Sequence, residues 1–516
     1  MFIFFIKKIR FIFINLYVRL YPVGALTSKW HAFQIRPWDL EIFESVDLND
    51  NFGSNIYIAS KKNKILKVNP KPTYFSTDYI ITDKARFSFD SLINNRLISN
   101  MLFSEKENAF IEPSLSFFLE KSFFLDFNKK FIIFLINESL DLINIIFLTR
   151  FMYLFGNFFR IRNLYKSENK LNFYIHGLTN IFSEITTKTY QCFLVCINSK
   201  IESSLLNTKL RLLFKDIKLT FYTFGCNFIS TFEFLYTNLN LNICFKFFEG
   251  KMLISKFCFK SENPVLFILG YSLSFRFSCF YLFMSNIRKI FINSIILKVS
   301  QFSNTEGFLF FDIKSVTKRL LSKSNAIFCI NLIDSFWSRN LLSSFKHKII
   351  WINTHGSDLS KIFNRLISTV SFTETEELHC NLEQRPQLLK VNSTKHISSK
   401  PLLSILIIIF NNFLTIDILN KDFMFLNHLS ELLNNDKKFQ RLREKTFTLD
   451  FFSKNFLFFI SKIGYLNFLP NISLYEDFYL NEHYSKNSIT MQEVSKVLRN
   501  KKKQSLNPLK PFSFLD

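Results

Sequence analysis

The sequence Gly53-Ser54-Asn55-Ile56-Tyr57-Ile58-Ala59-Ser60-Lys61-Lys62-Asn63-Lys64-Ile65-Leu66-Lys67-Val68 contains two β-prone runs separated by polar residues. The runs are Asn55–Ala59 and Ile65–Val68, and the polar turn between them is Ser60–Lys64. This pattern predicts a β-hairpin. Asn63 suits the turn, because asparagine tolerates a left-handed backbone better than most residues that carry a side chain.

Beyond this hairpin, short apolar runs alternate with polar segments. Buried strands of a parallel sheet read as continuous apolar runs, and the connecting helices cover both faces of the sheet. We therefore predict an α/β chain with a small β-rich N-terminal domain and parallel sheets flanked by helices. The strand candidates are Phe193–Ile197, Leu219–Phe224, Val265–Leu269, Ala326–Ile333 and Ile349–Asn353.

Three apolar stretches are tested as membrane spans. Phe131–Arg150 contains two acidic residues and is predicted as a buried helix. Pro401–Ile416 is shorter than the roughly 20 residues that a span needs, and is predicted as a buried amphipathic helix. Met1–Leu20 carries four interspersed cations and no serine, so we expect the remnant of a neighbouring domain rather than a transit peptide.

The composition sets the broad class. The chain has 516 residues, which suggests several domains, and a net charge of +24. Such a charge is typical of proteins that bind nucleic acid or anionic membranes. However, the chain also has 69 Phe but only 10 Gly and 11 Pro, and it is rich in Lys, Asn and Ile. This bias follows A/T-rich codons, as in many organelle genomes, so the charge favours a nucleic-acid partner only weakly.

Cysteine and histidine spacing gives little support for a metal site. The eight cysteines are Cys192, Cys196, Cys226, Cys244, Cys258, Cys279, Cys329 and Cys380, and no CxxC pair is among them. Cys192 and Cys196 fall in one apolar run, and on a strand both would face one side, so buried free thiols are expected. The eight histidines are scattered, and His379 beside Cys380 would point to the opposite face of a strand. Phosphate-binding glycine loops, GxSxG and HExxH are absent from the sequence.

Five blocks near the N-terminus resemble a known family. They are Tyr21–Lys29 (YPVGALTSK), Ile35–Leu40 (IRPWDL), Glu44–Asp47 (ESVD), Gly53–Ile56 (GSNI) and Asp83–Asp90 (DKARFSFD). Their shared order resembles the large peripheral-arm subunit of respiratory NADH:ubiquinone oxidoreductase (complex I), where its iron–sulfur half joins its molybdopterin-enzyme-like half. The resemblance covers roughly Pro22 to Lys496 and implies a molybdopterin-oxidoreductase-like multi-domain fold.

Three later blocks extend the resemblance. Thr354-His355-Gly356-Ser357-Asp358 matches a His-His-Gly-Asp loop of the family. His355 has the chemistry of a base near an acid, yet no nucleophile is placed beside it, so we interpret it as a structural loop histidine with local bonds. Phe372–Glu374 and Asn381–Gln387 match a segment that lies near the pterin in molybdopterin enzymes, with Gln384 in place of a glycine. Asp477–Met491 matches the end of the family, where Met491, Val494 and Leu498 repeat at helical spacing.

The resemblance also implies where cofactors lie. Tyr21 stands where the family has a cysteine that completes a [4Fe–4S] site, and a phenol does not replace a thiolate. We therefore expect no catalytic, cofactor-binding or metal residue and no cofactor on this chain, with the iron–sulfur clusters on a partner chain. The small domain, which has no cysteine, is expected to be structural.

The resemblance divides the chain into five parts. These are a basic apolar extension (1–20), a small β-rich domain resembling the 4Fe–4S Mo/W bis-MGD type without its cysteines (21–99), an α/β molybdopterin-oxidoreductase-like region (100–400), a helical region (401–500) and a basic tail (501–516).

The expected function is structural. We expect a mitochondrial, matrix-side portion of the complex I peripheral arm that scaffolds a separate cluster-bearing chain during NADH-to-ubiquinone electron transfer. The enzyme would be the whole complex, an H⁺-translocating NADH:ubiquinone reductase, with other peripheral-arm subunits as partners and neither nucleic acid nor a membrane span. Three alternatives remain: an active molybdenum- or tungsten-pterin oxidoreductase, a basic organelle RNA-binding protein with steep salt dependence, and an integral membrane protein.

Overall fold

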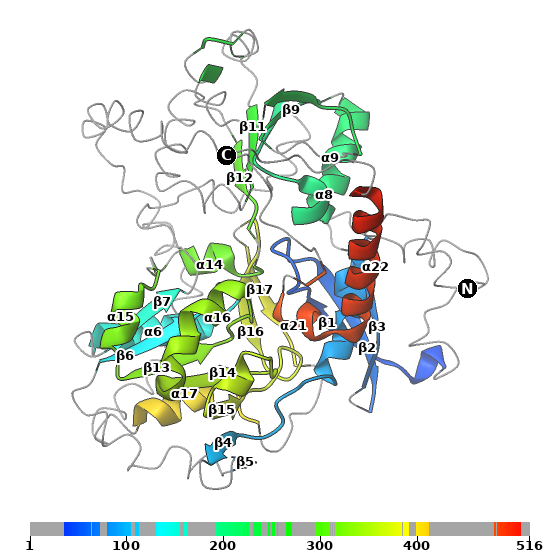
Figure 1. Ribbon diagram of the computed structural model, residues 1–516. Coiled ribbons are helices and arrows are strands. Elements are labelled where there is room, and N and C mark those ends of the chain that lie inside the picture. The colour runs from blue at the N-terminus through cyan, green and yellow to red at the C-terminus, as the bar shows by residue number, and fades with distance from the viewer. Residues whose placement is uncertain are drawn as a thin grey trace.

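Figure 1 shows the computed structural model of the chain. The structure describes residues 36–62, 64–72, 80–104, 109–112, 131–154, 159–163, 191–217, 219–225, 231–238, 246–247, 250–252, 255, 265–270, 295–300, 302–309, 311, 313, 315–383, 385–391, 399–411, 479–480 and 482–506. Tyr21, the extension before it, Gln384 and the basic tail beyond residue 506 lie outside these residues.

The predicted hairpin is confirmed as part of a three-stranded antiparallel sheet. Its strands are β1 (Glu41–Val46), β2 (Asn55–Lys61) and β3 (Lys64–Pro70), paired in that order. The short 3₁₀ turn η2 (Pro37–Asp39) precedes them. Lys62 takes the left-handed backbone of the turn, with φ 47°, while Asn63 lies outside the described residues.

One face of this sheet is covered by the chain that follows it. Helix α3 (Asp83–Phe87) begins where the Thr82 hydroxyl accepts a hydrogen bond from the Ala85 amide, and η3 (Ser88–Leu92) continues it. Burial of apolar side chains from both parts forms a small core between helix and sheet. This core consists of Ile56, Ile58, Ile65, Val68, Ile81 and Ala85.

A seven-stranded sheet forms the main body. Its order is β5 (Ala109–Ile111), β4 (Met101–Ser104), β15 (Arg365–Ser368), β14 (Ile349–Asn353), β13 (Ala326–Ile330), β6 (Ile132–Ile136) and β7 (Phe159–Asn163). The strands from β15 to β7 run parallel, whereas β4 pairs antiparallel with β15 and with β5. A parallel sheet needs crossover connections, which here include helices on both of its faces.

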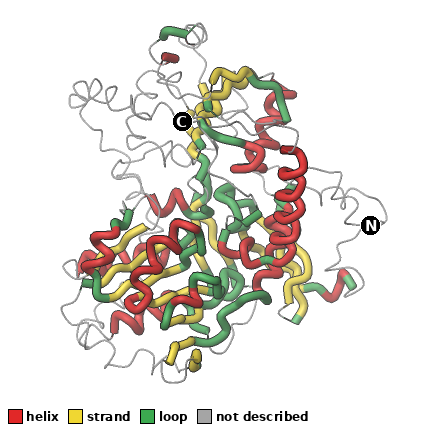
Figure 2. Tube along the Cα trace, viewed as in Figure 1, coloured by secondary structure: helices red, strands yellow, loops and turns green. Residues whose placement is uncertain are grey.

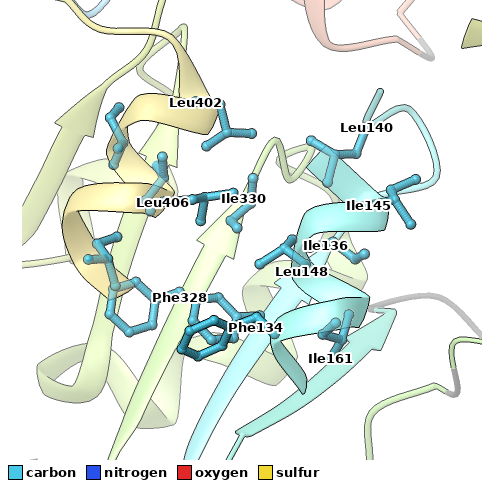
Figure 3. Close-up of a cluster of buried hydrophobic side chains, with 14 of the residues drawn as sticks. Phe134, Ile136, Leu140, Ile145, Leu148, Ile161, Phe328, Ile330, Leu402 and Leu406 are labelled. Atoms are coloured by element: carbon cyan, nitrogen blue, oxygen red, sulfur yellow. The ribbon is translucent and has the colours of Figure 1, made fainter. Parts of the chain in front are cut away.

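The two faces of this sheet bury different cores. On one face, α6 (Leu142–Leu154) and α17 (Leu402–Asn411) cover alternate residues of β6 and β13, including Phe134, Phe328 and Ile330. Figure 3 shows Leu402 and Leu406 on the side of α17 that faces the strand carrying Phe328 and Ile330. On the other face, α15 (Lys318–Lys323) and α16 (Phe336–Leu342) pack on the intervening residues. The shorter α14 (Thr305–Leu309), η4 (Ser343–Lys348) and η5 (Ser360–Ile362) complete the loops.

The prediction of one buried helix over Phe131–Arg150 is wrong in its first part. Ile132–Ile136 forms the fully buried strand β6, and the helix α6 begins only at Leu142. The polar segment from Asn137 to Asp141 separates them. An apolar run of five residues has the length of a buried strand, which periodicity alone does not distinguish from a helix. The helix predicted at Pro401–Ile416 is confirmed over α17, and the residues beyond Asn411 lie outside the described part.

A second, five-stranded parallel sheet is inserted between β7 and β13. Its order is β10 (Leu235–Asn238), β9 (Thr220–Phe224), β8 (Gln191–Val195), β11 (Val265–Leu269) and β12 (Ile295–Lys298), with α8 (Ser199–Glu202) and α9 (Ser204–Ile217) following β8. Phe193 stacks on Tyr222 and Phe267 of the neighbouring strands at centroid distances of 5.0 and 5.1 Å. These cross-strand aromatic contacts stabilise the sheet.

The strand predicted over Phe193–Ile197 ends earlier than expected. Cys196 has φ 50° and lies beyond β8, so the two thiols do not share one strand face. The turn passes close to Gly270, where an added Cβ would lie 2.2 Å from the Cys196 carbonyl oxygen. Cys192 and Cys196 are nevertheless both buried free thiols, as predicted.

The C-terminal elements of the described chain pack against its N-terminal elements. The two-stranded sheet of β16 (Glu377–Cys380) and β17 (Pro386–Leu389) contacts β1, and α21 (His483–Asn487) and α22 (Ile489–Leu506) contact η3 and α3. In Figures 1 and 2, α22 and the three-stranded sheet occupy the same part of the molecule, and α22 contacts α3 and η3, which cover that sheet. The predicted fold class, mixed α/β with a small N-terminal β sheet and parallel sheets with helices, is confirmed. No helix in the described ranges is both long and apolar enough to cross a bilayer.

Candidate functional site

The blocks that carried the resemblance meet at one place, where the small sheet joins the main body. We call polar joint a group of buried and half-buried residues, namely Ser91, Arg96, Thr354, His355, Glu374, His483 and Tyr484. They come from η3 and the segment after it, from the end of β14, from the loop before β16, and from α21. Residues that lie hundreds of positions apart in the sequence are thus hydrogen-bonded to one another.

His355 lies at the centre of this joint and is fully buried. Its Nε2 lies 2.8 Å from the Ser91 carbonyl oxygen, which only accepts, so Nε2 carries the proton. Its Nδ1 is therefore an acceptor, 2.8 Å from Thr354 Oγ1 and 3.2 Å from His483 Nε2. The partners Ser91 and His483 are 264 and 128 positions away, so the bonds are not only the local ones that the sequence predicted.

A consistent proton arrangement follows from these contacts. His483 Nε2 donates to Thr354 Oγ1 at 3.0 Å, and the Thr354 hydroxyl donates to His355. Burial lowers the pKa of His355 to about 4 and holds the pKa of His483 well below its usual value. Both imidazoles are thus neutral at physiological pH. The hydroxyl of Tyr484, whose pKa is raised by desolvation, accepts a hydrogen bond from the Phe372 amide at 3.4 Å.

A buried ion pair forms the second part of the joint. The guanidinium of Arg96 contacts the carboxylate of Glu374, and their side chains are 7% and 4% exposed. The same Glu374 oxygen accepts from the Ser371 amide at 2.9 Å. Arg96 also forms an antiparallel β-bridge with His355, with the Gly356 amide 2.8 Å from the Asn95 oxygen. The segment that follows the small sheet is therefore attached to the main body by a buried ion pair and by backbone hydrogen bonds.

The block Asn381–Gln387 holds the other side of the small sheet. The Leu382 amide donates to the Asn51 oxygen at 2.7 Å, and Gln387 Nε2 donates to the Gly53 oxygen at 2.8 Å. Gly53 has φ 65°, and an added Cβ would lie 2.3 Å from the Gln387 amide oxygen. Glycine is required here both by conformation and by space. This block therefore serves as a contact between two parts of the chain.

The C-terminal block makes the third contact. Glu482 and Ser485 form a capping box that starts α21, and Lys486 Nζ donates to the Asp334 backbone oxygen. The Thr490 amide donates to Asp90 at 3.0 Å. Met491 and Val494 pack with Phe87 and Tyr479, as the predicted apolar face requires, while the Leu498 side chain lies outside the described part.

A buried charged cluster lies beside the joint. Lys84 is 3% exposed, donates to the Asn49 oxygen at 2.8 Å, and faces the carboxyl groups of Asp47, Asp50 and Glu482. Burial raises the pKa of all three carboxyl groups, that of Asp50 to about 7 with a further contribution from Asp47. One lysine thus faces three carboxyl groups whose pKa values burial raises.

A cavity of about 450 Å³ adjoins the joint. It lies at the carboxyl ends of the parallel strands, where Ser139, Asn331, Thr354 and Thr369 follow β6, β13, β14 and β15. Open α/β sheets bind their ligands at this edge. The start of α17 and residues 482–484 close the cavity.

Sequence reasoning found part of this site. It singled out His355, Glu374 and Glu482, and the structure brings all three to the joint or to the cavity. It treated His483 as one scattered histidine and did not consider Tyr484. The position of both directly before the Ser485–Met491 block was the available signal.

The chain is similar in sequence to subunits of NADH-ubiquinone oxidoreductase. Residues 40–90 match a family model described as the NADH-ubiquinone oxidoreductase NDSU1/NuoG-like 4Fe-4S domain. The chain is 27% identical over 401 residues to the NADH-ubiquinone oxidoreductase 75 kDa subunit of Acanthamoeba castellanii, covering 74% of this chain and 56% of that protein. It is 30% identical over 298 residues to the 75 kDa subunit of Dictyostelium discoideum, covering 54% and 42%. A segment of 80 residues is 41% identical to the mitochondrial 78 kDa subunit of Neurospora crassa, covering 16% and 11%.

The resemblance is confirmed. The chain is similar in sequence to the 75 kDa subunit of NADH-ubiquinone oxidoreductase. It spans about half the length of the 75 kDa subunits that it matches. The matched residues 40–90 contain the three-stranded sheet with α3 and most of η3, which are the elements that the polar joint holds.

The comparison corrects the cofactor prediction. We expected iron–sulfur clusters only on a partner chain, but the chain itself carries a domain of the 4Fe-4S type, so an iron–sulfur cluster is indicated on it. The residues described in that domain do not identify its ligands. Residues 40–90 contain no cysteine, and such clusters are normally held by thiolates. The cysteines in the described part, Cys192, Cys196, Cys329 and Cys380, are buried in separate elements, and no metal-binding group of three His, Cys, Asp or Glu occurs there.

Proposed function

We propose that the chain is a structural subunit of the peripheral arm of mitochondrial NADH:ubiquinone oxidoreductase. The matched 4Fe-4S-type segment and the similarity to 75 kDa subunits support this assignment. The relative from Neurospora crassa is named as mitochondrial, which supports the location in that organelle. As part of the same proposal, the chain lies on the matrix side of the inner membrane.

The polar joint is the observation that carries the structural role. Both ring nitrogens of His355 are bonded within the chain, and the imidazole is neutral, so this histidine is poorly placed to move protons for a substrate. The ion pair of Arg96 and Glu374 is similarly enclosed. These groups connect the segment that follows the small sheet to the main body. A rigid connection of this kind suits a subunit whose task is to hold electron carriers of the arm in line.

The partners follow from the same assignment. We propose that the chain contacts other peripheral-arm subunits, including a chain that carries iron–sulfur domains. The whole complex, rather than a catalytic residue of this chain, would then perform NADH oxidation and quinone reduction.

The test is to find where the polypeptide migrates. Respiratory membranes would be solubilised under native conditions, the complexes separated by size, and each fraction analysed by mass spectrometry for peptides of this chain. We expect its peptides to peak with NADH-oxidising activity and with other peripheral-arm subunits, and to be scarce in fractions of the other respiratory complexes. Migration of the intact chain with ribosomes, or as a free protein containing stoichiometric molybdenum or tungsten, would overturn the proposal.

A further inference from the structure

The C-terminal helices form one wall of the cavity beside the polar joint. We call strap the residues 482–497, which comprise α21 and the first half of α22, the red helices of Figure 1. α21 contacts η3, and α22 contacts both η3 and α3. Residues 482–484 also line the cavity, so the strap lies between the cavity on one side and the small sheet's helical cover on the other.

The buried side of the strap carries mostly small polar side chains. Its fully buried residues are Glu482, Ser485, Ser488, Met491 and Ser495. Met491 is the only large apolar residue among them. The hydroxyls of Ser485 and Ser488 make hydrogen bonds within the strap itself. A serine buries little apolar area, so this side of the strap gains little from the hydrophobic effect.

Helix α17, which also lines the cavity, is attached in the opposite way. Its buried face is entirely apolar and consists of Leu402, Ile405, Leu406, Ile409 and Phe410. All of these side chains belong to the core of the seven-stranded sheet. Since the free energy of burial rises with the apolar area removed from water, α17 is held much more firmly than the strap.

Hydrogen bonds to separate segments hold the strap in place. His483 Nε2 donates to Thr354 Oγ1, and the Thr490 amide donates to the Asp90 carboxylate, both at 3.0 Å. Lys486 Nζ donates to the Asp334 backbone oxygen. Water offers the same groups comparable bonds, so each of these contacts contributes only a small net stabilisation.

The two helices of the strap are bonded to each other. Gln492 Nε2 donates to the Lys486 oxygen at 2.7 Å, which joins α22 to α21. The Met491 amide donates to Ser488 Oγ at 3.2 Å, at the point where the helices meet. These bonds persist when the contacts to the rest of the molecule break, so α21 and the first half of α22 move together.

We propose that the strap detaches and returns as one unit while the sheets stay folded, and that its detachment opens the cavity to molecules from solvent. Segments with few buried apolar contacts open at a lower free energy than the core does. The inference rests on the contacts of the strap and not on the proposed role in complex I.

The first test is hydrogen exchange of the purified full chain at pH 7, followed by mass spectrometry with fragmentation of the peptides. The amides of residues 482–497 should exchange together, at least about a hundredfold faster than those of β13 and β14, as expected for a local opening. The Phe372 amide is an independent reporter, because it lies outside the strap and donates to the Tyr484 hydroxyl. It should exchange at the rate of the strap.

A variant weakens the strap from outside. Asp90→Ala leaves the Thr490 amide without its acceptor, so exchange of the strap should accelerate about tenfold while β13 and β14 are unchanged. The matched control is Glu493→Gln, which removes a carboxylate from the exposed side of the strap and should have no effect.

The second test measures access to the cavity. Val370 is buried in the cavity lining, so Val370→Cys places a thiol there that iodoacetamide labels when the cavity opens. Adding Asp90→Ala should raise the labelling rate about tenfold, in parallel with exchange of the strap. Mass spectrometry locates the label among the native cysteines.

Three results would overturn the proposal. They are exchange of the strap no faster than that of β13, exchange of the Phe372 amide at a rate unlike that of the strap, and labelling that does not respond to Asp90→Ala. Equal acceleration of the strap and of β13 in Asp90→Ala would also contradict it, because the whole fold would then be opening. The exchange rates of the unchanged chain decide the first two points even if the variant does not fold.

Discussion

The polar joint and the core of the seven-stranded sheet hold the molecule together in different ways. In the core, residues such as Phe134, Phe328 and Leu406 are buried by contact with other apolar side chains, and no pairing of atoms is required. In the joint, His355, Arg96 and Glu374 each depend on a partner with a particular donor or acceptor. Apolar packing tolerates substitution by residues of similar volume, whereas a buried polar group that loses its partner bears its full desolvation cost.

The largest effect should come from the ion pair. Replacing Arg96 by Met leaves the Glu374 carboxylate buried without its counterion, and breaking such a pair typically costs about 3–5 kcal/mol of the free energy of unfolding. The double variant Arg96→Met/Glu374→Leu removes both charges and should lose much less. Urea denaturation followed by fluorescence measures both values. A double variant as unstable as the single one would show that packing, rather than charge, dominates the joint.

The core should respond to volume. Leu406→Ala opens space between α17 and the sheet and should cost about 2–5 kcal/mol. Leu406→Met, which nearly conserves volume, should cost less than about 1.5 kcal/mol. The same denaturation experiment compares the two variants. Equal losses of stability in the two variants would mean that the core, like the joint, depends on the exact side chain and not on its volume.

This difference explains what the sequence could predict. The apolar runs of β11 and β14 were located to the residue, because five consecutive buried side chains are a strong local signal. The same signal did not separate β6 from α6 within Phe131–Arg150, since both are buried and apolar. The polar blocks were recognised individually, but their meeting at His355 depends on contacts 128 and 264 positions apart, which no local pattern contains. The cavity depends on the same long-range contacts.

Within the joint, His355 tests the value of a single polar residue. His355→Phe leaves the Ser91 carbonyl and the Thr354 hydroxyl with one partner fewer, and each buried unsatisfied group costs about 1–3 kcal/mol. His355→Gln retains an amide that can donate, so it should lose less stability than the Phe variant. Thermal unfolding of the two variants against the unchanged chain gives the comparison. If the Phe variant were the more stable of the two, the hydrogen bonds of His355 would contribute little.

The stability that the joint contributes should fall in acid, whereas the stability that the apolar core contributes should not. The folded pKa of His355 is about 4, below its ordinary value of 6.5, so the unfolded state binds the proton more readily. The stability from its neutral form is present above pH 6.5 and is lost as the pH falls toward 4. At pH 5 the loss is about 2 kcal/mol, from 1.5 pH units at 1.36 kcal/mol each. The advantage of the unchanged chain over His355→Phe should therefore shrink by this amount between pH 7.5 and pH 5.

The comparison with His355→Phe is needed because other groups act in the opposite direction. The raised pKa values of Asp50 and Asp141, both about 7, mean that acidification favours the folded state through these carboxyl groups. Their contribution is common to both proteins and cancels in the difference. A constant difference across this pH range would contradict the assignment of a neutral buried histidine.

The smallest effect should come from the surface of the small sheet, where Lys61 Nζ lies 3.0 Å from the Asp39 carboxylate. Their side chains are 35% and 41% exposed, so water screens the pair and competes for both groups. Lys61→Ala should change the free energy of unfolding by less than about 1 kcal/mol, and less still in high salt. Like Arg96 and Glu374, this pair joins a cation to a carboxylate, but it lies in a solvent-exposed environment. Suppose that Lys61→Ala and Arg96→Met lowered the free energy of unfolding by similar amounts. Burial would then not explain why the Arg96–Glu374 pair contributes to stability.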